Sequence, residues 1–524
     1  MELLPAERNT RIKQQKSRLT ERLLQQHDGA IVFCDGHKPS LNDLPFAGLL
    51  EKLHRDAKEN GPVSLIATRV SADARPLAVV FVKSSASAFE LLTAAARAWK
   101  TFSGSTVRNL LVATHGLDAD VSARALEATT TAALAATAAM PALKSKPRRH
   151  VDLEQITLAG EGGIDAERIL AVDRGNHLAR WLTTLPPNYL SSEKYRRALM
   201  KLARQERWAF SFLNEAALTR LGAGAFLAVS RANAHRDAGI VRLRYRAPDR
   251  SGVVGKLALV GKGICFDTGG INLKPHKSMY HMHEDMQGSA VAVGTLLALT
   301  RLKAPYDIDC WLALTENEIG PHAYRPQEVV RAVNGTTIQV VHSDAEGRMA
   351  LADTLALAAR EKPALIIDYS TLTGACVMAL TERFSGAFTN RPRWHAPIEA
   401  AGRESGERVW PFPMDEDFDA DLDSSIADVI VPIAIGQRIA PERNIVGQRI
   451  GVGGVEARHP AQEVERLALA AVALVRLGGR LQRSHRLRHE AESLIEVRER
   501  HVDVVPLAVD LRDLLVERDR LGVE

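Results

Sequence analysis

Cysteine is scarce in this sequence of 524 residues, which contains four cysteines: Cys34, Cys265, Cys310 and Cys376. None of them stands at a spacing typical of a structural zinc site or of a dithiol redox motif. Each lies in an apolar stretch, so we predict buried free thiols in a reducing compartment. A small secreted domain held together by disulfides is therefore not expected.

Long apolar runs are also missing. No segment approaches the roughly 20 consecutive apolar residues that a membrane-spanning helix needs. Residues 1–26 lack the apolar core of a secretory signal peptide, and their polar, basic composition predicts a surface helix or a frayed arm. We therefore expect a cytoplasmic protein without a membrane partner.

A strong excess of one charge is absent, because the formal net charge is +5 and the pI is about 9.0. So mild a basic balance permits binding to DNA but does not argue for it. DNA binding stays open as an alternative from a different functional class. A salt-dependent mobility shift with duplex DNA would separate it from an enzyme.

Lysine and aromatic residues disappear toward the C-terminus. The last lysine is Lys362 and the last aromatic residue is Phe418, whereas arginine and valine stay frequent. A glycine-rich turn at 450–454 lacks the Lys-Ser/Thr pair of a phosphate-binding loop. Residues 430–524 are therefore predicted to form a divergent, arginine-rich tail and not an ordinary domain core.

The length and the pattern of apolar residues predict two α/β domains, since 524 residues exceed one hydrophobic core. Short strand-like runs alternate with helical runs in both halves, which is typical of α/β architecture. A helical pattern over residues 165–185 predicts a connecting helix. We place the domains at 1–160 and 191–429, joined by a connecting segment at 161–190. The expected strands lie at 30–34, 63–70, 77–83 and 109–114 in the first domain, and at 256–263, 307–315, 336–341 and 364–370 in the second.

Charged residues gather at strand ends and helix starts of the second domain. In open α/β sheets, sites form outside the carboxyl ends of the strands, so we expect these side chains to meet. Four clustered carboxylates repel one another unless cations are present, and two divalent ions about 3.5–4 Å apart are the usual solution. The residues are Lys262, Asp267, Lys274, Asp285, Asp344, Glu346 and Arg348.

The stretch "HSDAEGRMALADTLALA" places Asp344, Glu346 and Arg348 on alternate positions between an apolar segment and a helical pattern. Residues i and i+2 of an extended segment face the same way, so both carboxylates are predicted to reach the metal ions together. The start of the following helix favours a bound anion.

Each piece has an ordinary alternative when taken singly. Asp344, Glu346 and Arg348 could form a surface ion-pair cluster, Asp267 could be a turn residue, and Asp285 could cap a helix. Three nearby histidines lack the HExxH pattern of a zinc protease, and we do not assign them as ligands. These histidines are His276, His281 and His283.

Taken together, four stretches resemble the leucine aminopeptidase family, the M17 dinuclear metallopeptidases. "VGKGICFDTGGINLKP" is similar to the first lysine- and aspartate-bearing motif of that family, and "HSDAEGRMALAD" resembles its signature NTDAEGRL-x-LAD. "ENEIGPHAYRPQEVV" and "STLTGACVMAL" look like the segments before and after the signature. The likeness runs from about residue 165 to 429. It implies a macro-like α/β domain at the N-terminus and a catalytic α/β domain with a mixed, mostly parallel sheet.

The resemblance also implies roles for individual residues and two divalent ions per subunit, Mn²⁺ or Zn²⁺. Lys274 would polarise the scissile carbonyl, and Arg348 would hold a bicarbonate that acts as general base. The substrates would be peptides with a free N-terminus and a leucine-type first residue, cleaved by a homohexamer. One metal ion would be bound by Lys262, Asp267, Asp285 and Glu346, the other by Asp267, Asp344 and Glu346. The pocket for the first side chain would be lined by Met282, Thr371, Leu372 and Gly374.

The sequence departs from the family pattern at three places that we weigh. Ser343 replaces a threonine and Met349 replaces a leucine, both conservative in size. Beyond residue 429 the family pattern stops abruptly. We predict a reading-frame shift in the gene as the cause, and ordinary divergence or a fused segment is the alternative. An inactive or unstable homologue is then the alternative to an active enzyme, and on chemistry alone a two-metal phosphoesterase is another. Reading the gene in its other frames after codon 430 would test the shift.

Overall fold

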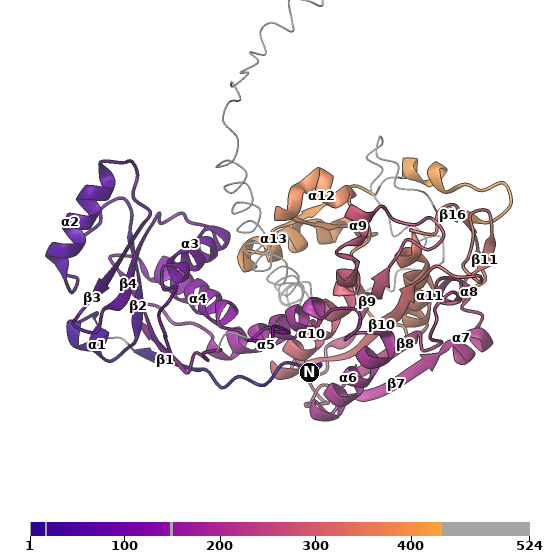
Figure 1. Cartoon of the computed structure of the whole chain (residues 1–524), viewed down its shortest axis with the longest axis horizontal. Helices are drawn as coiled ribbons and strands as arrows, with labels where there is room; N and C mark the ends of the chain where they lie inside the picture. Colours follow the sequence, from indigo (N-terminus) through magenta and orange to yellow (C-terminus); the bar gives the residue numbers. More distant parts are fainter. Residues whose placement is uncertain (1, 16–17, 147–149, 415, 432–524) are drawn as a thin grey trace, which may run out of the picture. The chain divides into compact units, whose positions relative to one another are not determined.

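The computed structural model describes residues 2–15, 18–146, 150–414 and 416–431. Its fold is α/β, as predicted (Figure 1). Within the described ranges no helix is both long enough and apolar enough to cross a membrane. Most of the predicted tail lies outside the described residues, so the prediction of a frame shift stays a prediction.

The first sheet has the strand order β1-β6-β5-β2-β4-β3, and all neighbours are parallel except β3 and β4. Its strands alternate in side-chain direction, as the pleat requires. Ile31 and Phe33 pack under α3 and α4, whereas Ala30 and Val32 face the side of α1 and α2. The strands are β1 (Arg11–Gln15), β2 (Gly29–Asp35), β3 (Leu65–Val70), β4 (Arg75–Val82), β5 (Asn109–His115) and β6 (Gln155–Ala159), and the helices are α1 (Glu21–Gln25), α2 (Ala47–Lys58), α3 (Ala88–Lys100) and α4 (Ala119–Ala136).

The N-terminal segment corrects one expectation. Residues predicted as a surface helix or frayed arm include β1, a strand that pairs in parallel with β6, so that Ile12 lies opposite Ile156. Pairing with a segment about 144 residues later decided this outcome, and the local polar composition did not reveal it. Ile12 also packs against the core beside the sheet.

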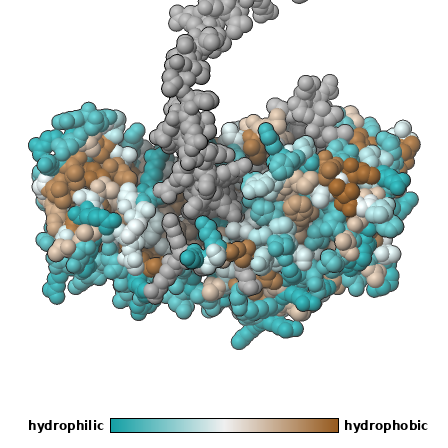
Figure 2. All heavy atoms as spheres, viewed as in Figure 1, coloured by the Kyte–Doolittle hydropathy of each residue, from teal (hydrophilic) through white to brown (hydrophobic). Residues whose placement is uncertain are grey.

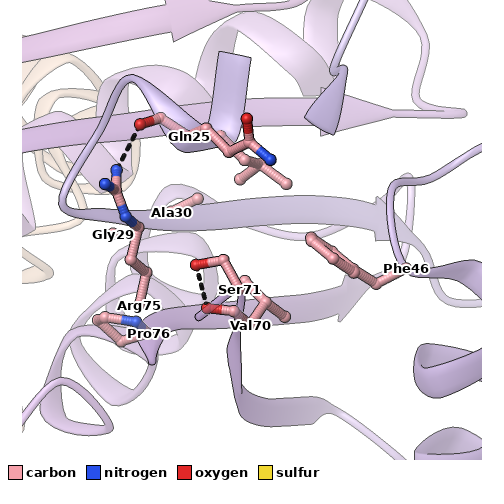
Figure 3. Close-up of a pocket in the computed structure, with 9 residues that line it drawn as sticks. Gln25, Gly29, Ala30, Phe46, Val70, Ser71, Arg75 and Pro76 are labelled. Atoms are coloured by element: carbon pink, nitrogen blue, oxygen red, sulfur yellow. Dashed lines mark hydrogen bonds between the residues drawn. The ribbon is translucent and has the colours of Figure 1, made fainter. Parts of the chain in front are cut away.

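A small cavity lies beside β2 and β4 of this sheet (Figure 3). Gly29, Phe46, Val70 and Pro76 are among its lining residues, and the Arg75 guanidinium donates a hydrogen bond to the Gln25 carbonyl. Its volume is about 10 Å³. This is room for about one water molecule, so the cavity does not offer a ligand site.

The second sheet has the strand order β13-β9-β10-β8-β7, and four of its five strands point the same way because β8 alone runs opposite. Apolar side chains of α5, α6 and α10 cover one face and those of α8 and α11 cover the other. The strands are β7 (Ala209–Asn214), β8 (Gly239–Tyr245), β9 (Gly255–Asp267), β10 (Tyr306–Asn317) and β13 (Leu365–Tyr369), and the helices are α5 (Ala166–Thr184), α6 (Ser192–Gln205), α7 (Glu215–Leu221), α8 (Gly224–Ser230), α10 (Gln287–Arg301) and α11 (Glu346–Arg360).

Two small sheets lie outside the second sheet. The predicted strand at 336–341 belongs to one of them: β11 (Val329–Arg331), β12 (Thr337–Val340) and β16 (Val429–Val431) pair in that order. Residues 430 and 431, the first of the predicted tail, therefore extend a strand beside β12. The other small sheet pairs β14 (Ser385–Ala387) with β15 (Val409–Pro411), and the remaining helices are α9 (His276–Met279), α12 (Ala375–Leu380) and α13 (His395–Ser405), with 3-10 turns η1 (Met282–Glu284), η2 (Thr381–Arg383), η3 (Pro392–Trp394) and η4 (Glu416–Leu422).

None of the four cysteines takes part in a disulfide in the described part of the chain, as predicted. Cys34, Cys265 and Cys310 are buried, but Cys376 on α12 is only half-buried, which corrects the expectation for that residue. Burial raises the pKa of the Cys34 thiol to about 12, so this thiol stays protonated and unreactive near neutral pH.

Acidification should destabilise the protein through His177 on α5. Burial lowers the pKa of this histidine, a bond of 2.6 Å from Nε2 to the Ala139 carbonyl opposes that shift, and the neighbouring Arg8, Arg180 and Arg174 add to it. Together these effects lower the pKa from 6.5 to about 4. Between pH 6.5 and 4 the unfolded chain binds more protons, so the free energy of unfolding falls as the pH falls. From pH 7 to pH 5 we expect a loss of about 2 kcal/mol from this residue.

The measurement is urea denaturation at pH 7 and pH 5. His177→Gln keeps a donor for the Ala139 carbonyl but does not titrate. Between pH 7 and pH 5 the variant should therefore lose about 2 kcal/mol less unfolding free energy than the wild type. His150, a half-exposed histidine that pairs with Asp152, provides the control His150→Gln. Equal pH dependence in the wild type and His177→Gln would contradict the prediction.

Candidate active site

Lys262 and Asp267 both lie on β9, five residues apart, and in a regular strand they would face opposite sides. The register with β10 shifts between them: Thr315 lies opposite Ile264, but Asn317 lies opposite Asp267. Three steps along β9 therefore match two along β10, which is a β-bulge. The extra residue restores the phase and turns both side chains toward the same face.

The Lys262 ammonium lies at the centre of one half of the cluster. Its Nζ is 2.8 Å from Asp285 Oδ1 and 2.9 Å from Glu346 Oε1, and it donates to the Thr371 carbonyl at 2.8 Å. Burial lowers the pKa of this amine, but Asp285 and Glu346 outweigh burial and raise it above its usual value. The side chain, 2% exposed, thus places one positive charge between two buried carboxylates.

Lys274 makes equivalent contacts in the other half of the cluster. Its Nζ is 2.8 Å from Asp267 Oδ2 and 2.5 Å from Asp344 Oδ1. Burial lowers its pKa, but Asp267 and then Asp344 raise it above the usual value, so the ammonium stays charged. Gly269 and Gly270, with φ of +87° and +64°, make the tight turn that returns Lys274 to the end of β9.

The carboxylates of the cluster are crowded and incompletely paired. Burial raises the pKa of both Asp285 and Glu346, and the neighbouring Asp267 raises each of them further. Oδ2 of Asp285 and Oε2 of Glu346 are buried without a hydrogen-bond partner among the described residues. Oxygens of Asp267, Asp344 and Glu346 lie within 4.8 Å of one another. Hard oxygen donors so arranged fit divalent cations.

The predicted extended geometry around Asp344 is wrong. The strand β12 ends at Val340, Asp344 lies in a turn, and Glu346 is the first residue of α11. The two carboxylates therefore meet through a turn followed by a helix start, and not through the alternation of a strand. A glycine allows this approach, because a Cβ at Gly347 would lie 2.4 Å from Lys262 Cε.

The remaining predicted residues lie on neighbouring elements. Arg348 is buried in the first turn of α11, 5% exposed. Thr371 reaches the cluster directly, since its Oγ1 donates to Asp285 Oδ1 at 2.8 Å. Leu372 packs against the core beside α11, and Gly374 is the residue before α12. Met282 is half-buried in η1, three residues before Asp285.

The three nearby histidines lie on α9 and in or beside η1. His281 Nδ1 and His283 Nε2 are 3.6 and 4.0 Å from Glu284 Oε1. The group of side chains that could hold a metal ion in the described part of the chain consists of Asp267, Asp344 and Glu346.

Sequence reasoning missed several contributors to the site. The Thr371 carbonyl on Lys262 is a backbone group, which a motif of side chains cannot reveal. Asn317 donates from Nδ2 to Asp267 Oδ1 at 2.8 Å. A further departure from the signature, His342 in place of asparagine, accepts a hydrogen bond from the Asp344 amide at 3.2 Å. Only Asn317 could have been suspected beforehand, from its position at the end of a strand.

Exposed apolar side chains are frequent in the segments that carry the cluster. Figure 2 shows hydrophobic patches on a mostly hydrophilic surface. Leu273 is 54% exposed, between the glycine turn and Lys274, and Met378 on α12 is 76% exposed. Ile271, Tyr280 and Val377 are also exposed.

Residues 177–435 match the model of the cytosol aminopeptidase family, catalytic domain. This segment, just under half of the chain, is therefore similar to the catalytic domain of that family. The cytosol aminopeptidase match begins 12 residues after the start of the sequence likeness described above and ends close to residue 429, where the pattern was seen to break.

Curated relatives of the family agree with this assignment. A probable cytosol aminopeptidase of Desulfovibrio desulfuricans is 42% identical over 253 residues, which are 48% of this chain and 50% of that protein. One of Acinetobacter baumannii is 38% identical over 292 residues, covering 55% of this chain and 60% of that protein. The chain thus spans about half the length of the curated relatives it matches.

Solved structures show the same fold over more of the chain. A tomato leucine aminopeptidase mutant has a TM-score of 0.71 at 26% identity, covering 82% of this chain and 87% of that one. Leucyl aminopeptidase from Trypanosoma cruzi has a TM-score of 0.71 at 22% identity, covering 91% of this chain and 98% of that one, a likeness of fold alone.

Proposed function

We propose that this chain is a metal-dependent aminopeptidase that releases N-terminal residues from peptides. The observation that carries the proposal is the largely buried cluster of four carboxylates and two lysines, in which two carboxylate oxygens have no partner among the described residues. The likeness of residues 177–435 to the family model and the names of the relatives support the same activity. A cytoplasmic homohexamer remains the expected assembly.

The cluster would hold two divalent ions, Mn²⁺ or Zn²⁺, on Lys262, Asp267, Asp285, Asp344 and Glu346. When bound, such a pair polarises a carbonyl oxygen and lowers the pKa of a water molecule. Lys262 must then lose its proton and bind as a neutral amine. The dication that it binds beside Asp285 would supply the positive charge that the Lys262 ammonium supplies in the metal-free protein.

The other residues would act on the peptide. Lys274, charged and 13% exposed, would donate to the oxygen that becomes negative when the amide is attacked. Arg348 would hold a bicarbonate that accepts the proton of the attacking water. The free amino group of the peptide would lie on the side of Asp285, so that the bond cleaved is the one next to the N-terminus.

Half-buried apolar groups close to this end of the cluster favour a first residue with an apolar side chain. Met282, Thr371, Leu372 and Gly374 would line its pocket. Thr371 is held on Asp285 by its hydroxyl and on Lys262 by its carbonyl. The proposed pocket would thus be joined to the cluster by this residue.

The test is a time course of peptide digestion followed by mass spectrometry. We expect the peptide Leu-Ala-Gly-Phe to lose leucine first and then successive N-terminal residues, while its N-acetylated form stays intact. Cleavage of the acetylated form, or release from the C-terminus, would contradict the proposal. No release from either form by folded, metal-loaded protein would favour the inactive homologue.

A further inference from the structure

Ser343 joins the segment that carries Asp344 to the loop that leads from Asp267 to Lys274. The serine is completely buried. Its Oγ donates to the Gly269 carbonyl at 2.7 Å and accepts from the Asn272 amide at 2.8 Å. Its own amide donates to the side-chain oxygen of Asn272 at 2.9 Å. One residue thus fastens together two segments that are about 70 positions apart in the sequence.

The carbonyl of Ser343 accepts hydrogen bonds from Asn317 at the end of β10 and from Tyr324 in the segment that follows this strand. The Tyr324 hydroxyl donates to it at 2.6 Å and Asn317 Nδ2 at 3.1 Å. The same Nδ2 donates to Asp267 Oδ1 at 2.8 Å. This sets the orientation of the amide, because the reverse orientation would turn its oxygen toward a carboxylate and a carbonyl.

These contacts form a continuous path between two carboxylates of the cluster. Asp267 is bonded to Asn317, Asn317 is bonded to Ser343, and Asp344 follows Ser343 in the chain. The carboxylates at the two ends of this path lie close together, because the Lys274 ammonium contacts both Asp267 and Asp344. Asn317 and Ser343 are 1% and 0% exposed, so water does not compete for these bonds.

We propose that Ser343 and Asn317 are positioning residues that fix the separation between the carboxylates of Asp267 and Asp344. The proposal rests on the proposed function in one respect, namely that these carboxylates hold divalent cations. Neither residue is among those proposed to contact the substrate. Partners that orient the ligands of a metal typically contribute 10–100-fold in metal affinity or activity.

The test compares Ser343→Ala, Ser343→Thr and Ser230→Ala. The threonine is the residue of the family signature and keeps the hydroxyl. Ser230 is also completely buried, and its hydroxyl donates to Glu215 at 2.6 Å, so its removal is a matched loss of one buried serine hydroxyl. The metal-free proteins are titrated with Mn²⁺ and the free ion is followed by electron paramagnetic resonance.

We expect the Mn²⁺ affinity of one of the two sites to fall about 10–100-fold in Ser343→Ala. It should change less than threefold in Ser343→Thr and Ser230→Ala. In the loaded enzyme kcat should fall by a similar factor for Ser343→Ala, while KM stays within about threefold. Asn317→Ala removes the other half of the path and should show the same pattern. It serves as the test variant if Ser343→Ala does not fold.

Hydrogen exchange of residues 268–275 in the metal-free protein gives a readout that does not depend on the proposed function. Loss of the Ser343 hydroxyl should speed exchange in this peptide at least about tenfold, since the Asn272 amide loses its acceptor. Unchanged Mn²⁺ affinity together with unchanged exchange would overturn the proposal. A wild type that binds no Mn²⁺ would contradict the proposed function instead, and the exchange comparison would still decide on Ser343.

Discussion

Glu346→Gln is expected to lower kcat by about 10³-fold or more and to reduce the metal content from two ions per subunit to one or none. The side chain keeps its shape in this variant but loses its charge. Glu346 is 1% exposed, one of its oxygens contacts Lys262 at 2.9 Å, and the other has no partner among the described residues. A residue proposed to bridge both ions weakens both sites when its charge is lost.

The measurement is elemental analysis of purified protein, combined with hydrolysis of leucine amide. Treatment of the wild type with a chelator should abolish hydrolysis, and Mn²⁺ or Zn²⁺ should restore it. The matched control is Glu361→Gln at the other end of α11, where the carboxylate pairs with Arg242 and Lys256. This control should keep two ions. A single ion in active wild-type protein would count against the two-metal proposal.

Lys274→Ala is expected to lower kcat by about 10²–10³-fold while both ions stay bound. Removal of one donor to a developing oxyanion typically has an effect of this size, about 3–4 kcal/mol. Asp267 and Asp344 raise the pKa of the Lys274 ammonium, so the charge it offers the substrate persists through the neutral range. The variant loses a contact proposed to be strongest in the transition state, so kcat should change more than KM.

Lys277→Ala provides the control, because this lysine is exposed on α9, three residues away. It should leave kcat unchanged. Lys274→Met, which keeps the length of the side chain, separates loss of charge from loss of bulk and should resemble Lys274→Ala. A fall of less than tenfold in both Lys274 variants would remove this residue from the mechanism.

The electrostatics of the cluster explain why Glu346→Gln should lose metal ions whereas Lys274→Ala should keep them. Lys262 and Lys274 each contact two carboxylates, so two positive charges face four negative ones in the cluster and an excess of negative charge remains. Dications would restore the balance, and loss of a carboxylate changes how many can bind. Loss of Lys274 leaves the proposed ligand set intact and changes only the charge presented to the substrate.

The sequence by itself predicted which charged residues gather in one cluster. Motifs with fixed spacing carried Lys262, Asp267, Lys274, Asp344 and Glu346, and each of them contacts at least one other member of the cluster in the structure. Short, nearly continuous apolar runs likewise located β2, β4, β9 and β10. A strand buried on both faces has apolar residues at most of its positions, and this pattern is easily recognised. The predicted domain boundaries and site roles stay predictions.

The tertiary structure decided how these residues meet. The β-bulge in β9 depends on pairing with β10, and the turn at Asp344 depends on packing of Glu346 and Gly347 against Lys262. Local sequence could not show either one, since both are set by residues more than 40 positions away.

Two further features depend on partners that are remote in the sequence. The strand β1 forms because β6 offers it an open edge, although its own composition is polar. Ser343 acquires its place from Gly269, Asn272 and Asn317, and a serine in a motif carries no sign of such contacts. The chain's pattern thus fixes which groups are available, whereas long-range hydrogen bonds and close packing fix their separations, and the separations govern the chemistry.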